Sequence, residues 1–277
     1  MSFDISDDES FVLVVSGLGA AVVVFRWVWT LNRVATVGCP SGQRRPLFLA
    51  PALGLGLVLL TLILFGAHEV KENGSYVLLF MVVGVVWIAI AVSLFQWLGV
   101  SLREDALENH NRAAITTISG GILGVSLTYA GGNIGEGPTI WTTFFSALMA
   151  TGALLVAWAC FEFATHVSEA ITIERDLASG VRLAGLLTAE GFILGRSVAG
   201  DWVSEEATAR DFVREAWPMV MLAVIAGVVQ RLLRPTASNQ SPAVGLYGWL
   251  LAVFYLMGAV LYVASLGSWN TVSAVIR

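Results

Sequence analysis

The feature of this sequence that most constrains its fold is a series of eight apolar stretches, each about 20 residues long. A helix of about 20 mainly apolar residues spans a lipid bilayer, so the sequence predicts an all-α, polytopic integral membrane protein. The spans are expected at residues 11–31, 47–67, 76–99, 113–132, 139–165, 181–200, 212–233 and 243–266. Thr, Ser, Gly and charged residues dilute the fourth and sixth stretches, which leaves six or seven spans as an alternative if one of them re-enters the membrane.

Charge sets the expected orientation and domain organisation. Charged residues make up 13% of the chain, against about 25% in a typical soluble domain. Placing both termini outside puts the connections 32–46, 100–112, 166–180 and 234–242 inside with most of the arginines, which the positive-inside rule favours. The connections are too short for a soluble core, so residues 1–277 are expected to form one membrane domain. The acidic start MSFDISDDES is unlike a cleavable signal peptide, and the net charge of −5 argues against nucleic acid as a partner.

Two segments near the middle of the chain resemble each other. Residues 111–120 read NRAAITTISG and residues 176–185 read DLASGVRLAG, and an offset of 65 residues aligns Asn111 with Asp176. Each segment follows an apolar span and a charged turn, so residues 76–132 and 139–202 are interpreted as tandem repeat hairpins. Residues 11–67 and 212–266 are candidate divergent hairpins, because both have an Arg- and Pro-containing connection before a Gly-rich helix.

The repeated helices carry small residues along one face. Gly120 and Gly124 form one GxxxG motif, and Gly191 and Gly195 form a second. Lipid provides no hydrophobic drive between helices, so close backbone approach across small residues is a common means of association. We therefore expect these two helices to pack closely, on each other about a pseudo-symmetry axis. The alternative is that the glycines only reflect the usual composition of membrane helices.

The charged turns before these helices hold candidate helix caps. Asn111 and Asp176 precede the first apolar turn, where a side-chain oxygen can accept hydrogen bonds from free backbone amides. A carboxylate at this position also interacts favourably with the helix dipole. The other interpretation treats Asn111, Arg112 and Asp176 as part of a cytoplasmic docking or ion-entry site.

The residues NRAAITTISGGILG, followed by ERDLASGVRLAGLLTAEGFILG and the closing GDW of residues 200–202, resemble the YjfL-like family of bacterial inner-membrane proteins. The resemblance covers residues 76–202 and implies two hairpins, each with an Asn-x-Ala-Ala start to its small-residue helix. The second copy departs from that pattern with Asp176. The family is a domain of unknown function often encoded near membrane-remodelling proteins of phage-shock type and polyamine-type amide ligases. The resemblance thus implies a fold, a cytoplasmic-membrane location and a membrane-stress context, and no catalytic residue.

Four ionisable residues are expected within spans, where each costs a few kcal/mol, namely Arg26, Glu162, Glu190 and Arg196. Glu190 lies midway along its helix and off the small-residue face. It is interpreted either as a proton- or cation-binding carboxylate, or as a group that is protonated or paired with Arg26 or a backbone donor. Arg196 is expected to snorkel towards the outer surface or bind lipid headgroups. Arg26 and Glu162 are expected to be interfacial anchors or ion-pair members.

The sequence favours non-enzymatic functions. It has no nucleophile elbow, phosphate-binding loop, HExxH motif or paired catalytic carboxylates, and its three histidines are too scattered for metal ligands. We therefore expect no enzymatic activity, no cofactor and no metal.

Two classes of function are left. The first is a membrane-embedded scaffold or accessory subunit of a multi-component, membrane-stress type system, in contact with the lipid bilayer. It would form a homo-oligomer or join a larger complex, and bind a cytoplasmic peripheral protein. The alternative is an oligomeric channel or transporter for a small cation or polyamine, with a path lined by Glu190, Thr116, Thr117, Ser119 and Thr128.

Overall fold

The structure is a computed structural model that describes residues 6–33, 41–235 and 243–267. Within them, eight helical segments are long and apolar enough to cross a membrane, the number that the sequence predicted. Their main helices are α1 (Asp7–Arg33), α2 (Ser41–Phe65), α4 (Gly74–Leu94), α5 (Arg112–Gly132), α6 (Ile140–Thr165), α8 (Leu177–Ser197), α9 (Glu205–Leu233) and α10 (Leu250–Ser265). The short helices α3 (His68–Glu72) and α7 (Val167–Thr172) and the turns η2 (Phe95–Leu98), η3 (Leu102–Glu108) and η4 (Val244–Trp249) complete the described secondary structure.

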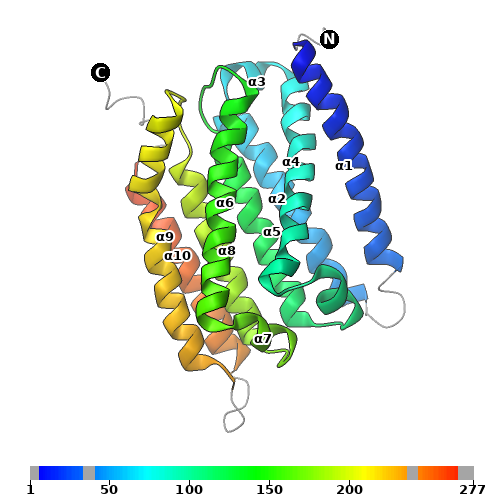
Figure 1. Ribbon diagram of the computed structural model, residues 1–277, viewed down its shortest axis with the longest axis vertical. Helices are drawn as coiled ribbons and strands as arrows, with labels where there is room; N and C mark the ends of the chain where they lie inside the picture. The colour runs from blue at the N-terminus through cyan, green and yellow to red at the C-terminus, as the bar shows by residue number, and fades with distance from the viewer. Residues whose placement is uncertain (1–5, 34–40, 236–242, 268–277) are drawn as a thin grey trace.

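The spanning helices form two layers (Figure 1). Helices α1, α4, α6 and α9 make up one layer, and α2, α5, α8 and α10 make up the other. Successive spans alternate in direction, so helices within a layer are parallel and the two layers are antiparallel. We call the end of the bundle at which α1 begins the α3 end, and the opposite end the α7 end, after the short helices found there. This arrangement consists of four consecutive hairpins, each contributing one helix to each layer.

The core of the bundle is built around α5 and α8. In these two helices 78% of the apolar segment is buried, against 6% to 39% in the other six spans. The most extensive helix–helix contact joins α5 to α8, with α2 packed on α5 and α10 packed on α8. Large apolar side chains such as Phe11, Leu53 and Phe254 are exposed on the outer helices. An apolar exterior around a more polar interior is the pattern of a chain surrounded by lipid, and it supports a multi-pass membrane protein.

The 65-residue repeat is visible in the backbone. Helix α5 covers residues 112–132 and α8 covers residues 177–197, so both of their ends differ by that offset. The residue before each N-cap, His110 or Arg175, adopts a left-handed conformation with φ of 51° or 54°. The helices are followed by Gly135 and Gly200, with φ of 101° and 144°, again 65 residues apart. Left-handed backbone is uncommon for residues other than glycine, so its recurrence at matching positions marks two copies of one structural unit.

Four helices begin at least four residues earlier than the apolar stretches indicated, among them α1 at Asp7 rather than 11 and α2 at Ser41 rather than 47. Helix α8 begins at Leu177 rather than 181, and α9 begins at Glu205 rather than 212. The first turns of α8 and α9 are polar but capped. The Asp176 side chain accepts from the backbone amides of Ala178 and Ser179, and the Ser204 side chain accepts from the backbone amide of Ala207. Hydropathy does not detect a capped polar turn. The correction places Arg182 and Glu215 well inside helices rather than at their ends.

Asn111 and Asp176 cap their helices. The Oδ1 atom of Asn111 accepts from the amides of Ala113 and Ala114 at 2.9 and 3.3 Å, and its Nδ2 donates to the Ile171 carbonyl at 2.6 Å. The side chain therefore ties the start of α5 to the end of α7. Both capping residues are at most 2% exposed, so neither is free to dock a partner.

Replacing Asn111 with alanine is expected to lower the free energy of unfolding by about 1–2 kcal/mol, because two amides and a buried carbonyl lose their partner. Unfolding of the purified protein in mixed micelles of mild detergent and dodecyl sulfate measures the change. The exposed Asn109 is a matched control, and Asn109→Ala is expected to change stability by less than about 0.5 kcal/mol. Equal losses in the two variants would contradict the cap.

Candidate functional site

The two GxxxG motifs lie in the contact between α5 and α8. A Cβ added to Gly120 would come within 3.0 Å of Ala184, and one added to Gly191 would come within 3.0 Å of the Gly124 backbone. Gly124 and Gly195 likewise contact carbonyl groups of the facing helix, at Leu187 and Leu127. The helices therefore meet backbone to backbone in parallel, with reciprocal contacts related by the repeat. No path for a solute passes between surfaces this close.

Glu190 is buried in α8 with an unsatisfied carboxylate oxygen. The residue is 1% exposed, and its Oε1 atom is buried without a hydrogen-bond partner. Arg26, the proposed alternative partner, is on the exposed surface of α1, which packs on α4 at the edge of the bundle. The structure therefore does not contain the Glu190–Arg26 pair. A buried carboxylate without a partner is costly, and this residue is the least explained polar group in the interior.

Arg196 does not extend to the surface as the sequence had suggested. It is 2% exposed, and its Nη1 lies 3.3 Å from Oε2 of Glu215 on α9. The expectation of a snorkelling arginine was wrong because it placed Arg196 on a lipid-facing side of α8, whereas most of α8, including Arg196, is buried by its neighbours. The ion pair joins α8 to α9 near the α3 end.

Arg26 and Glu162 both lie towards the α7 end, but they differ in role. The Glu162 carboxylate accepts from the amide and hydroxyl of Ser168 at 2.8 and 2.6 Å, and so fixes the turn between α6 and α7. It serves as a turn-stabilising acceptor rather than as the predicted anchor or ion-pair member. Arg26 lines a groove between α1 and α4.

The hydroxyl residues of the predicted path are not brought together with Glu190. Thr116 and Ser119 donate back to carbonyls of their own helix, at Arg112 and Ile115. Thr117 donates to the Gly180 carbonyl at 3.4 Å across the α5–α8 contact. Thr128 lies further along α5 and hydrogen bonds Val125 and Thr151. Thr117 and Ser119 are about 200° apart around their helix, so they cannot line the same passage.

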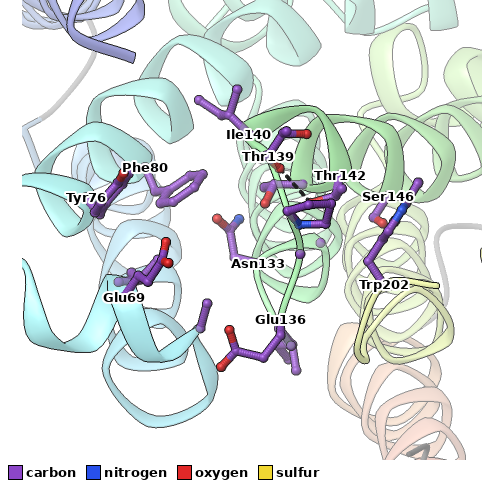
Figure 2. A pocket seen from close by; sticks show the side chains of 18 of the residues that line it. Glu69, Tyr76, Phe80, Asn133, Glu136, Thr139, Ile140, Thr142, Ser146 and Trp202 are labelled. Atoms are coloured by element: carbon purple, nitrogen blue, oxygen red, sulfur yellow. Dashed lines mark hydrogen bonds between the residues drawn. The ribbon is translucent and has the colours of Figure 1, made fainter. Parts of the chain in front are cut away.

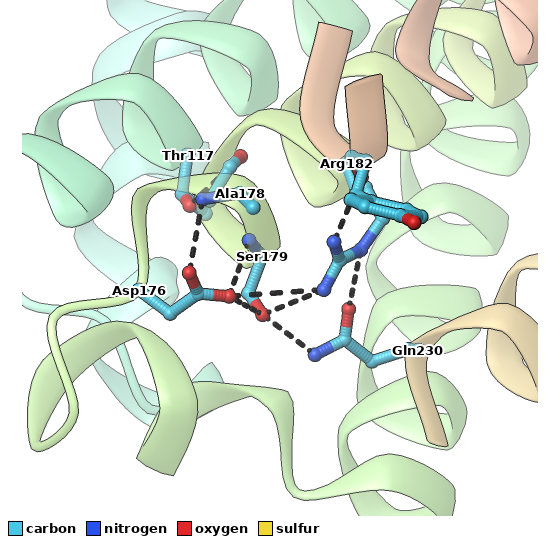
Figure 3. A network of polar contacts seen from close by, with 8 residues as sticks. Thr117, Asp176, Ala178, Ser179, Arg182 and Gln230 are labelled. Carbon is cyan, nitrogen blue, oxygen red and sulfur yellow. Dashed lines mark hydrogen bonds and ion pairs between the residues drawn. The ribbon is translucent and has the colours of Figure 1, made fainter. Parts of the chain in front are cut away.

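A buried polar network at the α7 end is the most connected group of side chains in the described chain (Figure 3). The Arg182 guanidinium donates through Nε to Oε1 of Gln230 at 3.0 Å, through Nη1 to the Tyr247 carbonyl at 2.8 Å and through Nη2 to Oγ of Ser179 at 2.9 Å. Gln230 Nε2 also donates to this hydroxyl, which in turn donates to the Asp176 carboxylate at 2.6 Å. The Arg182 side chain is 3% exposed and the Asp176 side chain is fully buried. Nη2 of Arg182 lies 3.8 Å from Oδ2 of Asp176.

This network fastens three parts of the chain. Asp176, Ser179 and Arg182 belong to the start of α8, Gln230 to the end of α9 and Tyr247 to η4 before α10. Each polar group has partners, as buried charges require. Arg182 lies at the start of the predicted span 181–200, and no pattern in the sequence predicted the network. The only local signal was the spacing of Asp176, Ser179 and Arg182, three residues apart, which places them on one side of the helix.

The α7 end also carries exposed charges. Arg234 donates to Glu169 at 2.7 Å and lies 3.6 Å from Glu174. The hydrogen bond from Arg234 lowers the pKa of Glu169, and the same bond raises the pKa of Arg234. Arg112, the residue after the α5 cap, is exposed and lines a groove between the starts of α2, α5 and α8 and the end of η4. Exposed charge of both signs is suited to a protein surface or to lipid headgroups.

A small polar pocket lies at the α3 end (Figure 2). It measures about 80 Å³ and lies beside the ends of α2 and α5, α3, the start of α4 and the loop before α6. Figure 2 shows Asn133 between Glu69, Tyr76 and Phe80 on one side and Thr142, Ser146 and Trp202 on the other. The loop before α6 is held by the matching segment after α8. The Asp201 carboxylate accepts from the Glu136 amide, and the Trp202 amide donates to the Glu136 carbonyl. No pattern in the sequence predicted this pocket.

The charged residues of α8 have no counterparts in α5. With the 65-residue offset, Arg182, Glu190 and Arg196 align with Thr117, Val125 and Gly131. The two central helices thus share backbone geometry while only the second copy carries buried charge. Ion pairs and hydrogen bonds to α9 and η4 account for the two arginines.

Comparison of the chain with protein-family models, with curated proteins and with solved structures gives no match. The resemblance to the YjfL-like family stays a prediction that rests on the quoted residues.

Proposed function

We propose that this chain is a non-enzymatic, multi-pass membrane protein that acts as a scaffold or accessory subunit of a larger complex. Its eight apolar helices support the membrane location. The bacterial cytoplasmic membrane, both termini outside and the membrane-stress context follow from the resemblance and from the arginine distribution. In this orientation the α7 end faces the cytoplasm.

The observation that carries the proposal is the closed centre of the bundle. Helices α5 and α8 contact each other through glycine and backbone atoms along their length. Each nitrogen of the Arg182 guanidinium donates one hydrogen bond within the polar network, and these bonds fix α8 to α9 and η4. A transporter that alternates access needs helices that separate or rock against each other. Backbone contact and buried ion pairs suit a rigid support better.

The exposed charges of the α7 end are the proposed docking surface for a peripheral protein. We define this surface by Arg103, Glu104, Glu108, Arg112, Glu174 and Arg175, all of which are exposed. Rim charges of this kind mainly affect the rate and specificity of association. Asn111 and Asp176, which the sequence left as alternatives for docking, contribute here only by fixing the helix starts.

Chemical crosslinking followed by affinity purification of the full-length protein from its own membranes tests the docking surface. We expect a peripheral protein to be captured by the wild type and by Arg210→Glu, a charge reversal at the α3 end, and to be lost with Arg112→Glu. Arg112 and Arg210 are both exposed, so neither change is expected to disturb folding. Equal capture by Arg112→Glu and the wild type would contradict docking at the α7 end.

Glu190 favours a second candidate function, a channel or transporter for a small cation. Its unsatisfied buried Oε1 atom is the specific observation, because ionisable groups retained within the membrane commonly mark ion pathways. The scaffold proposal predicts that proteoliposomes containing the pure protein show no more cation flux than protein-free liposomes. Flux that disappears in Glu190→Gln and persists in Glu104→Gln, an exposed acid of the α7 end, would support the channel and exclude an inert scaffold.

A further inference from the structure

We propose that the pocket at the α3 end binds a small organic cation through a primary ammonium group. This inference is independent of the scaffold proposal, since it concerns the opposite end of the bundle. The first observation is the charge of the residues that line the pocket. Glu9, Glu69 and Glu136 line the pocket, and none of its described lining residues is Lys, Arg or His. The side-chain charge of the pocket lining is therefore negative only.

The second observation is an unsatisfied acceptor within the pocket. Asn133 is 6% exposed, and its Nδ2 donates to the Tyr129 carbonyl at 2.7 Å. Its Oδ1 atom is buried without a hydrogen-bond partner, and Figure 2 places the side chain in the middle of the pocket. A buried amide oxygen without a donor costs about 1–3 kcal/mol, which a bound N–H group would remove. No donor of the described chain reaches Asn133 Oδ1 and no cationic side chain lines the pocket, and an ammonium group supplies both.

Size and geometry favour an organic cation over a metal ion. Among the described residues, no three His, Cys, Asp or Glu side chains are placed to hold a metal ion, so the three carboxylates surround the pocket without converging on one point. Tyr76, Phe80 and Trp202 add aromatic surface, which attracts organic cations. A volume of about 80 Å³ is several times the roughly 10–15 Å³ that a single water needs, which leaves room for a small head group.

Two of the acidic residues are already oriented by the fold. Glu136 Oε1 accepts from the His68 amide at 2.8 Å, and Glu9 Oε2 accepts from the Tyr76 hydroxyl at 2.9 Å. These bonds leave each carboxylate with further acceptor positions. Glu69 is exposed at the mouth on α3. A ligand ammonium would thus donate to Asn133 Oδ1 inside the pocket while the carboxylates neutralise its charge from the rim.

Calorimetric titration of the purified full-length protein in detergent with ethylammonium chloride is the test. We expect saturable binding of ethylammonium, and none of tetramethylammonium or sodium chloride at the same ionic strength, because neither of these carries an N–H donor. Asn133→Ala is expected to weaken binding more than tenfold, through loss of a charge-assisted hydrogen bond. Glu69→Gln and Glu136→Gln are expected to weaken it about two- to fivefold each, as for exposed charge pairs.

Glu104→Gln, the same change at the α7 end, is the matched control and is expected to leave ethylammonium binding unchanged. Because Asn133→Ala also removes the bond to Tyr129, Glu69→Gln provides a variant that touches no hydrogen bond of the described fold. Equal heats for the three salts would overturn the proposal. So would equal weakening by Glu69→Gln and Glu104→Gln, since binding would then reflect overall charge.

A primary ammonium can come from a soluble amine or from the headgroup of phosphatidylethanolamine. Nanodiscs of phosphatidylethanolamine and of phosphatidylcholine distinguish these sources. Loss of ethylammonium binding only in the phosphatidylethanolamine nanodiscs assigns the pocket to the lipid headgroup. Equal binding in both assigns it to a soluble amine, and either outcome supports an ammonium site. Absence of binding in both lipids would contradict it.

Discussion

Arg182→Ala is expected to lower the free energy of unfolding by about 3–5 kcal/mol, the largest loss predicted for any single side chain here. The substitution removes the donors to the buried Gln230 and Ser179 side chains and to the Tyr247 carbonyl. It also leaves the buried Asp176 carboxylate without the nearby positive charge. The loss exceeds that of an ordinary hydrogen bond because several polar groups remain buried and unsatisfied at once.

Unfolding in mixed micelles, followed by tryptophan fluorescence, measures this loss. Arg103→Ala is the matched control, because Arg103 is also near the α7 end and pairs with one carboxylate, yet is 73% exposed. The control is expected to change stability by less than about 1 kcal/mol. A loss in Arg182→Ala no larger than in the control would show that the network does not hold α8 to α9.

Gly191→Leu is expected to destabilise the bundle by about 3 kcal/mol. Its added side chain would overlap the backbone of Gly124, and backbone atoms of a packed helix cannot move aside as a flexible side chain can. The α5–α8 contact would have to open along its length, which would also separate Gly120 from Ala184. Thermal unfolding of the detergent-solubilised protein, monitored by circular dichroism, measures the effect.

Gly152→Leu on α6 provides the comparison. An added Cβ at Gly152 has no neighbour within 4 Å, so the same substitution meets open space there. Because leucine is also the better helix former, this variant is expected to be neutral or slightly stabilised. Similar destabilisation in both variants would mean that helix propensity or lipid packing, rather than the α5–α8 contact, determines the result.

Local features of the fold could be predicted from the sequence. Span length and hydropathy gave the eight helices, and their alternation gave the hairpins. The caps at Asn111 and Asp176 and the close approach at Gly120 and Gly191 depend on residues within one helical turn or on a spacing of four. Such signals can be read along the chain because their physical cause is local.

The polar interior could not be predicted in this way. Arg182 and Gln230 are 48 residues apart, and Arg196 and Glu215 face each other only because α9 packs on α8. Without that packing, each charged residue is read singly, and a single arginine near a helix end is assigned to the membrane surface. The pocket around Asn133 likewise combines α3, α4 and two loops that become neighbours only in the folded chain.

The even number of spans in each repeat determines how the two copies are related. Helices α4 and α5 form one two-span unit, and α6 and α8 form the next, so both copies run in the same direction through the bundle. The axis that relates them consequently runs along the helices, whereas the axis of inverted-repeat transporters lies across them. Because both copies lie in one chain, the second can hold Arg182, Glu190 and Arg196 within its central helix while the matching positions of the first are Thr117, Val125 and Gly131. A homodimer of identical hairpins cannot encode this asymmetry.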